Sequence, residues 1–118
     1  MEVKFYSYSK SGDKTYFKSD LVKNNNIYYF IDKENNKMEL SILSNKHVIL
    51  KRDGNVKQTL TFKENLKETS IYQSLELDLK LEIYTKKIDI KDNSISIEYD
   101  SFYEDYLTDS FKIVLLFK

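Results

Sequence analysis

The sequence predicts one all-β domain over residues 1–118: a single antiparallel up-and-down barrel of about eight to ten strands, with little or no helix. Three observations support this prediction. Apolar and polar residues alternate along most of the chain, which is the period of a strand with one buried face. Asn, Asp and Gly residues, which tolerate the positive φ of tight turns, separate the alternating runs. No window of helical length carries an apolar stripe along one face.

The clearest strand begins at Leu75, where five aliphatic residues alternate with four charged ones as far as Ile83. At 180° per residue this pattern places every aliphatic side chain on one face of a sheet and every charge on the other. The same criteria, applied from the N-terminus onward, predict strands near residues 2–9, 14–23, 26–33, 37–44, 46–52, 55–63, 68–74, 75–84, 86–91, 94–103 and 106–117. Neighbouring segments of this set are expected to merge in places.

Short connections between consecutive strands favour an antiparallel meander, and closing the meander into a barrel removes its two exposed edges. The turns are expected at Ser11-Gly12-Asp13, Asn24-Asn25-Asn26, Glu34-Asn35-Asn36, Ser44-Asn45, Asp53-Gly54 and Asp92-Asn93. A barrel of about eight strands is filled by its own side chains, whereas one nearer ten has room for a small ligand.

Two runs, residues 27–31 and 113–117, are apolar on both faces of the predicted sheet. Each therefore needs cover on the outside of the barrel as well as the inside. A local cap, from a loop or from Phe102 and Tyr103, would supply it. A contact with another protein copy would supply it equally well, since large exposed apolar patches often mark partner sites.

Composition excludes several classes of function. The chain has no Cys, so it has no disulfide framework, thiolate zinc site or cysteine nucleophile. Its 19 basic and 19 acidic residues cancel, which gives no general attraction to nucleic acid or anionic membranes. The N-terminus has no apolar h-region, and the longest apolar run is far shorter than a membrane-spanning helix. We expect a cytoplasmic protein with no nucleic-acid or membrane partner, although a homodimer is possible.

The charges are nevertheless separated along the chain. Residues 1–63 hold 12 basic and 7 acidic side chains, a net charge of +5, and residues 64–118 hold 7 and 12, a net charge of −5. Such a dipole could orient a charged ligand or steer self-association, or could have no role. Aromatic and basic residues also interleave near the N-terminus, the pattern of a weak single-strand nucleic-acid surface: Lys4, Tyr6, Tyr8, Lys10, Lys14, Tyr16, Phe17 and Lys18.

Two segments resemble a known family. The stretch from Thr85 to Asp100 is similar to the C-terminal half of the YwiB-like proteins, and His47 to Gly54 resembles their central strand, which ends in an Arg and a nearby Gly. The family consists of small bacterial proteins of unassigned function. The resemblance implies a calycin-type barrel, related in shape to lipocalins, and carries no known activity. A Thr-Pro-Tyr-Gly-like turn of the family has no counterpart here, where Ser74-Leu75-Glu76-Leu77 occupy roughly its place.

Nothing in the sequence indicates an enzyme. His47 is the only imidazole, and two glycines cannot supply the Gly-x-Ser-x-Gly elbow of a hydrolase. The carboxylates of Glu76, Asp78 and Glu82 alternate with leucines and belong to the solvated face. An acidic group near Glu104 lacks the spacing of a calcium loop. We expect no catalytic residues, metal site or cofactor.

Arg52 is the most distinctive single residue, because it is the one guanidinium beside 18 lysines. It follows Val48 and Leu50 at period two, so it can point into the barrel and bind a carboxylate or phosphate with its planar fork. A position facing water, or a pair with Asp53, is the alternative.

Two tyrosines complete the candidate site. Tyr29 has the phase of the isoleucines at both ends of the 27–31 run, and Tyr99 has the phase of Ile95 and Ile97. Buried tyrosine hydroxyls would make the interior amphipathic, although they could equally be satisfied by local packing. We therefore expect Arg52, Tyr29 and Tyr99 to bind a small amphipathic or anionic ligand. The alternative function is a protein-interaction or assembly module that uses residues 27–31 and 113–117.

Overall fold

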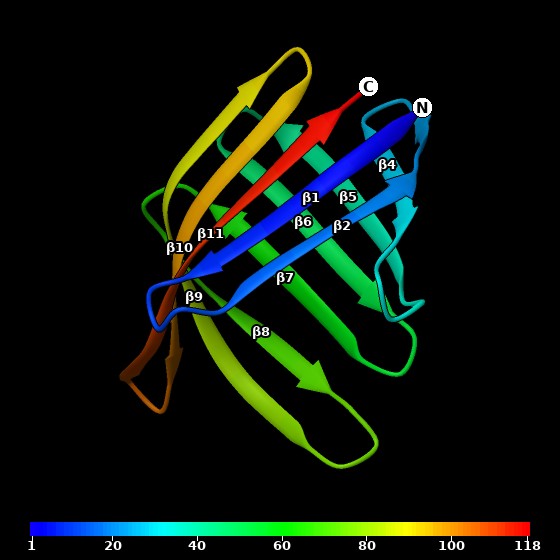
Figure 1. Ribbon diagram of the computed structural model, residues 1–118. Coiled ribbons are helices and arrows are strands. Elements are labelled where there is room, and N and C mark those ends of the chain that lie inside the picture. The colour runs from blue at the N-terminus through cyan, green and yellow to red at the C-terminus, as the bar shows by residue number, and fades with distance from the viewer.

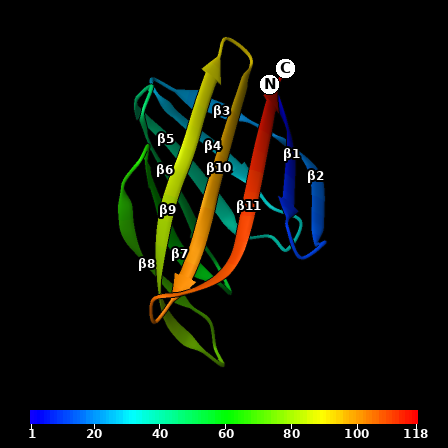
Figure 2. The same cartoon turned by 90° about the vertical axis from the view of Figure 1, so that its left-hand side faces the viewer.

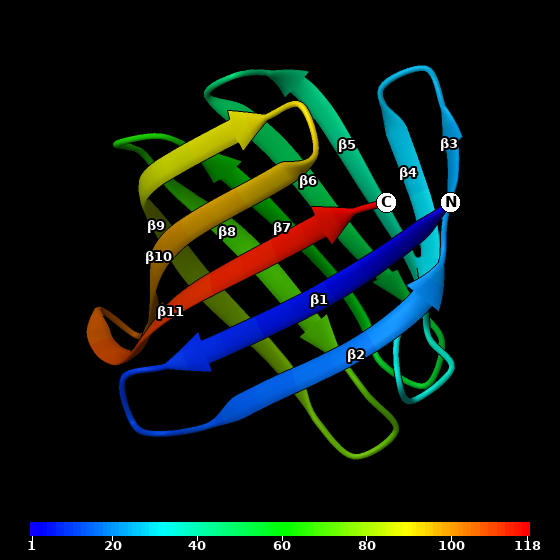
Figure 3. The ribbon, with the colours of Figure 1, turned by 45° about the horizontal axis from the view of Figure 1, so that its top comes forward.

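The computed structural model, which describes residues 1–118, contains eleven strands and no helix, so no helix is present that could cross a membrane (Figure 1). The strands are β1 (Glu2–Ser9), β2 (Lys14–Asp20), β3 (Val22–Asn24), β4 (Ile27–Ile31), β5 (Lys37–Ser44), β6 (His47–Asp53), β7 (Lys57–Lys63), β8 (Lys67–Gln73), β9 (Asp78–Lys91), β10 (Ser94–Tyr103) and β11 (Tyr106–Phe117). All of them belong to one antiparallel sheet that curves into a nearly closed barrel (Figure 3). The predicted fold class is confirmed.

The two edges of this sheet are consecutive in the chain. From β3 onward each strand pairs with the next as far as β11, which then pairs with β1, and β1 with β2. The predicted strand 14–23 is divided at Leu21, whose side chain is buried. The division arises because β2 pairs with β1 whereas β3 pairs with β4.

The seam between β2 and β4 has a side-chain link in place of a backbone ladder. Ser19 Oγ accepts a hydrogen bond from the Ile31 amide at 3.2 Å, while its own hydroxyl donates to the Asp20 carbonyl at 3.0 Å. The ring centroids of Phe17 and Phe30 also lie 6.2 Å apart across this seam, so closure of the barrel combines the serine link with aromatic packing.

The segments predicted as 75–84 and 86–91 merge into the single long strand β9, and their first residues form a turn. The Ser74 amide donates to the Leu77 carbonyl at 2.9 Å, and Leu75 is 97% exposed. The expectation that every aliphatic of this run faces the core is wrong for Leu75 and Leu77, because the turn precedes the first paired residue, Asp78. A turn does occupy the place that the family resemblance assigns to one.

A β-bulge bends β9 in its middle. Opposite Glu98 and Tyr99 of β10, the register moves from Lys87 to Thr85, so Lys86 is an extra residue. The strands on either side of the bulge follow the curvature of the barrel wall (Figure 2). The bulge explains why the sequence alternates separately before and after Thr85.

Nineteen buried apolar residues from the inward faces of the strands form the core. At the end of the barrel that contains Phe117, its ring stacks on Tyr28 at a centroid distance of 4.6 Å. Toward the opposite end, core residues such as Phe5 and Phe17 share the wall of a cavity with polar side chains, including Ser7, Thr15 and Arg52. The interior is thus packed at the Phe117 end and hollow at the other.

Candidate functional site

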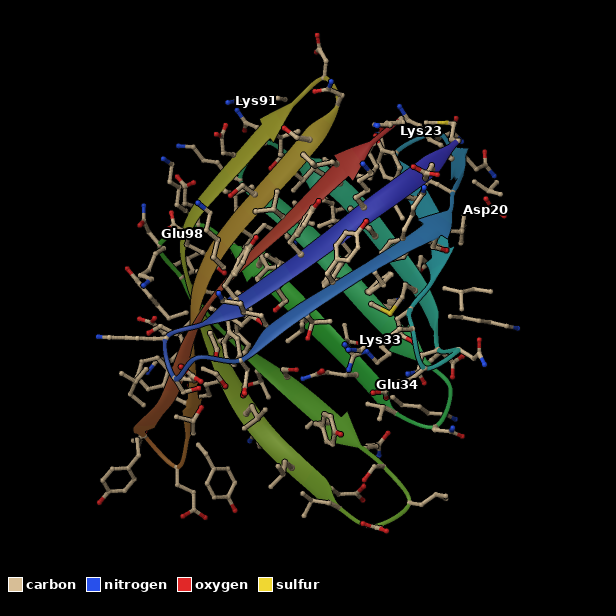
Figure 4. The ribbon with its side chains drawn as sticks, viewed as in Figure 1. Asp20, Lys23, Lys33, Glu34, Lys91 and Glu98 are labelled. Atoms are coloured by element: carbon tan, nitrogen blue, oxygen red, sulfur yellow. The ribbon has the colours of Figure 1, made fainter.

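The hollow end of the barrel encloses a cavity of about 220 Å³. Its wall combines apolar and polar side chains in similar proportion, and Lys33 and Glu34 of the turn from β4 to β5 form part of it (Figure 4). The lining residues are Phe5, Ser7, Thr15, Phe17, Asp32, Lys33, Glu34, Met38, Leu50, Arg52, Leu60, Tyr99 and Ile113. With roughly 30 Å³ per water molecule, the space equals about seven waters, somewhat below the 300–1,000 Å³ of most ligand sites.

Arg52 lines this cavity, in agreement with its predicted inward phase. Val48 and Leu50, which precede it at period two on β6, are buried in the core. The Arg52 side chain is 34% exposed, and its Nε lies 3.5 Å from Asp32 Oδ2. Its partner is therefore Asp32, not the neighbouring Asp53, and Nε itself makes no hydrogen bond of good geometry.

Asp32 owes its position to the tight turn that it begins. Its Oδ1 accepts hydrogen bonds from the Glu34 and Asn36 amides, both at 2.9 Å, and its Oδ2 accepts one from Asn36 Nδ2 at 3.0 Å. The side chain is only 8% exposed, so these donors and Arg52 stabilise a carboxylate that would otherwise be costly to bury. Asn35, at the centre of the turn, has the positive φ (63°) that Asn tolerates.

A second loop is attached to this turn through Asn36. Asn36 Oδ1 accepts a hydrogen bond from the Val56 amide at 3.3 Å. Gly54 lies directly against the same oxygen, and a Cβ placed on Gly54 would lie 2.3 Å from it. The rim of the cavity is thus a single polar network that joins the β4–β5 turn, the β6–β7 loop and Arg52.

Tyr99 lies on the cavity wall, as its phase on β10 predicts. Its ring packs between Phe62 and Phe111, at centroid distances of 5.0 and 5.1 Å. Burial raises the pKa of Tyr99 well above its ordinary value of 10.0, an effect that the nearby Arg52 partly opposes and Asp109 increases. The hydroxyl therefore stays protonated and is a neutral hydrogen-bond donor.

Tyr29 is not part of the cavity, and the expectation that it faces the interior is wrong. In β4 the inward residues are Tyr28 and Phe30, which are buried, whereas Tyr29 is 38% exposed on the outer face. Tyr28 stacks on Phe117 at 4.6 Å, and Phe30 packs against Phe5. Because all five residues of β4 are apolar or aromatic, these interior contacts determine the phase.

The other residues weighed from the sequence lie away from the cavity. His47 begins β6, at the opposite end of the strand from Arg52, and its Nε2 is buried without a hydrogen-bond partner. Glu104 and Asp105 form the tight turn of the β10–β11 hairpin, both with positive φ. No group of three or more His, Asp or Glu side chains converges closely enough to hold a metal ion.

Comparison with known proteins identifies relatives in sequence and in fold. The protein family described as "Domain of unknown function (DUF1934)" matches residues 9–115. The crystal structure of the YwiB protein from Bacillus subtilis superposes with a TM-score of 0.61 and 17% sequence identity, covering 99% of this chain and 89% of that one. These two findings confirm the family resemblance. A search of curated protein sequences gives no match.

The contact between Gly54 and Asn36 gives a test of the rim network. We expect Gly54→Ala to lower the free energy of unfolding by about 1–3 kcal/mol, because a methyl group cannot fit beside Asn36 Oδ1 without displacing it. Urea denaturation followed by circular dichroism measures the change. The control is Asn55→Ala at the exposed neighbouring position, with an expected effect within about 0.5 kcal/mol. Equal effects of the two substitutions would contradict this account of the rim.

The buried phenol of Tyr99 gives a pH dependence. Its raised folded-state pKa stabilises the protein fully below pH 10 or so, and this contribution is lost as the pH rises and the unfolded chain releases its proton. Tyr99→Phe should remove this part of the decline. Urea unfolding of the wild type and of Tyr99→Phe between about pH 8 and pH 11 measures this contribution. The other tyrosines are present in both proteins, so their effect cancels in the comparison. Parallel curves would show that Tyr99 is ionised normally.

Proposed function

The chain belongs to the family described as "Domain of unknown function (DUF1934)", and we propose that its function is the non-enzymatic, cytoplasmic binding of a small amphipathic anion inside the barrel. Arg52 would bind the acidic group of the ligand, and the apolar part of the wall would hold the rest. The observation that carries this proposal is the location of Arg52, the one guanidinium of the chain, on the wall of a cavity that apolar side chains also line.

The distribution of donors at the rim favours an anion. Four hydrogen bonds from its own turn already reach the Asp32 carboxylate. A guanidinium has five N–H donors in a fixed fork, and the contact of Arg52 with Asp32 is made through Nε, 3.5 Å from Oδ2. The terminal nitrogens make no hydrogen bond to the protein and remain available to a carboxylate or phosphate. Lys33, also at the rim, adds a second positive charge, and Glu34 a negative one.

The wall and the volume restrict the remainder of the ligand. Phe5, Phe17 and Leu50 contribute an apolar surface that favours a hydrocarbon or aromatic group. The protonated hydroxyl of Tyr99 offers one donor within this wall. A cavity of about 220 Å³ suits a compact acid and is too small for a long lipid chain.

Native mass spectrometry of gently purified protein tests the proposal. We expect an adduct on the wild-type chain that Arg52→Met removes, because losing hydrogen bonds to a charged group costs about 1.5–3 kcal/mol, or roughly 10–100-fold in affinity. Arg52→Lys, which keeps a charge near Asp32 while losing the fork, separates weaker binding from unfolding.

The matched control is Lys51→Met, since Lys51 is adjacent on β6 and points to the opposite, exposed face. It should retain the adduct. A wild-type protein without any bound mass, or equal loss in Arg52→Met and Lys51→Met, would rule out this role for the cavity.

A second candidate function is an assembly module that uses the outer sides of residues 27–31 and 113–117. Ile31 is 50% exposed and Leu116 is 37% exposed, and no loop covers them. Phe102, a candidate cap, instead packs under Lys67, whose Nζ lies 4.3 Å from its ring centroid. The absence of a local cap favours a contact with another protein copy.

Sedimentation velocity tests the assembly function. We expect a wild-type dimer or larger species that Leu116→Lys weakens by at least about tenfold, since a lysine ammonium would lose hydration in an apolar contact. Ile71→Lys on β8 places the same charge at another partly exposed apolar position, 46% exposed and outside both runs, and serves as the control. A wild-type monomer at high concentration would contradict the assembly role.

A further inference from the structure

The outer faces of β1, β2 and β11 together present a basic and aromatic surface. The register brings Tyr6 opposite Tyr16, with ring centroids 4.9 Å apart, and places Tyr8 between Lys14 and Lys112. We call this surface the lysine–tyrosine face; its members are Lys4, Tyr6, Tyr8, Lys14, Tyr16, Lys18 and Lys112. The only acidic neighbour with which it forms an ion pair is Glu2, 3.4 Å from Lys18.

A groove of opposite character lies at the hairpin ends of β9, β10 and β11. It has a volume of about 320 Å³ and contains four carboxylates and one lysine. We call it the acidic groove; it is lined by Asp78, Leu79, Lys80, Glu82, Tyr103, Glu104 and Asp105. Beside it, Tyr106 is 78% exposed and Leu107 is 56% exposed. The groove therefore offers negative charge next to uncovered apolar surface.

The two surfaces complement each other and cannot meet within one molecule, since a rigid sheet separates them. The lysine–tyrosine face lies mainly in the half of the chain with a net charge of +5, and the acidic groove in the half with −5. Both combine aromatic side chains with charge, so each can bury apolar area while pairing its charges with those of the other.

We propose that copies of this chain associate head to tail, with the lysine–tyrosine face of one copy on the acidic groove of the next. This inference rests on the assembly function and gives it a partner and an orientation. A two-fold contact between identical lysine–tyrosine faces would oppose four lysines with four lysines, which charge repulsion disfavours. The head-to-tail contact pairs unlike surfaces and so leaves one of each free at the ends, which allows growth beyond a dimer.

Single-stranded nucleic acid is the competing occupant of the lysine–tyrosine face, because aromatic rings and lysines on a sheet can stack bases and bind phosphates. The charge of the whole chain favours a second copy. Its net charge is zero, so a polyanion attracted to the positive half of the chain is repelled by the negative half. The acidic groove of a second copy is attracted to the lysine–tyrosine face and does not need to contact the negative half.

The experiment uses two full-length variants, one altered on the lysine–tyrosine face and the other in the acidic groove. The face variant carries Lys14→Ser and Tyr16→Ser. The groove variant carries Glu104→Gln and Asp105→Asn, which remove charge; Asn also tolerates the positive φ of residue 105. Circular dichroism and thermal unfolding check that both retain the wild-type fold.

Sedimentation velocity at low salt then distinguishes the possible contacts. We expect wild-type protein to form species larger than a dimer as its concentration rises, and these to dissociate at high salt. Each variant alone should be monomeric. Their equimolar mixture should form a 1:1 dimer that does not grow, because only the intact groove of one variant and the intact face of the other can bind.

Several results would overturn the proposal. A wild-type monomer at every concentration would remove both this contact and the assembly function. An oligomer that survives in both variants and is dispersed by Leu116→Lys would keep the assembly function and exclude the head-to-tail contact. A mixture that stays monomeric would exclude it as well, and so would salt-sensitive binding of a fluorescent single-stranded oligonucleotide to a protein that does not self-associate.

Discussion

The open end of the barrel depends on one buried charge, the carboxylate of Asp32. A carboxylate that is only 8% exposed is stable only if hydrogen bonds and an opposite charge replace the water that it loses. Two backbone amides, the amide group of Asn36 and the guanidinium of Arg52 do so here. Because these partners come from the β4–β5 turn and from β6, satisfying this one charge determines where the turn, the neighbouring loop and Arg52 lie.

The barrel itself follows from alternation, and so do the inward directions of Arg52 and Tyr99. In both cases the neighbours at period two are aliphatic. Before Tyr99 the intervening residues are polar, whereas before Arg52 only Lys51 is polar and Ile49 is not, so the phase is better determined for Tyr99. The phase of β4, and so the direction of Tyr29, cannot be predicted in this way because every residue of β4 is apolar or aromatic. The packing of Tyr28 on Phe117 determines which face of β4 turns inward. A phase that depends on long-range contacts cannot be derived from local spacing.

The same limit applies to the rim network. The sequence predicts a turn at Glu34-Asn35-Asn36 and another at Asp53-Gly54, but not that Asn36 touches Gly54 or that Asp32 faces Arg52. These pairs are about twenty residues apart and meet only once β4, β5 and β6 are aligned in register. Asp32 itself carries a weak local signal, since an Asp side chain often accepts a hydrogen bond from the amide two residues on, as it does here from Glu34. It gives no indication of a ligand site.

The seam between β2 and β4 has a consequence for access to the interior. The other neighbouring strands of the wall are joined by backbone pairing, whereas here the hydroxyl of Ser19 and the packing of Phe17 against Phe30 supply the link. Separation of two elements costs least where the fewest bonds must break, so transient opening should begin along this line. The Thr15 and Phe17 side chains of β2 border the cavity on that side. Separation along this seam would admit molecules too wide for the closed barrel while the backbone-paired strands of the remaining wall stay folded.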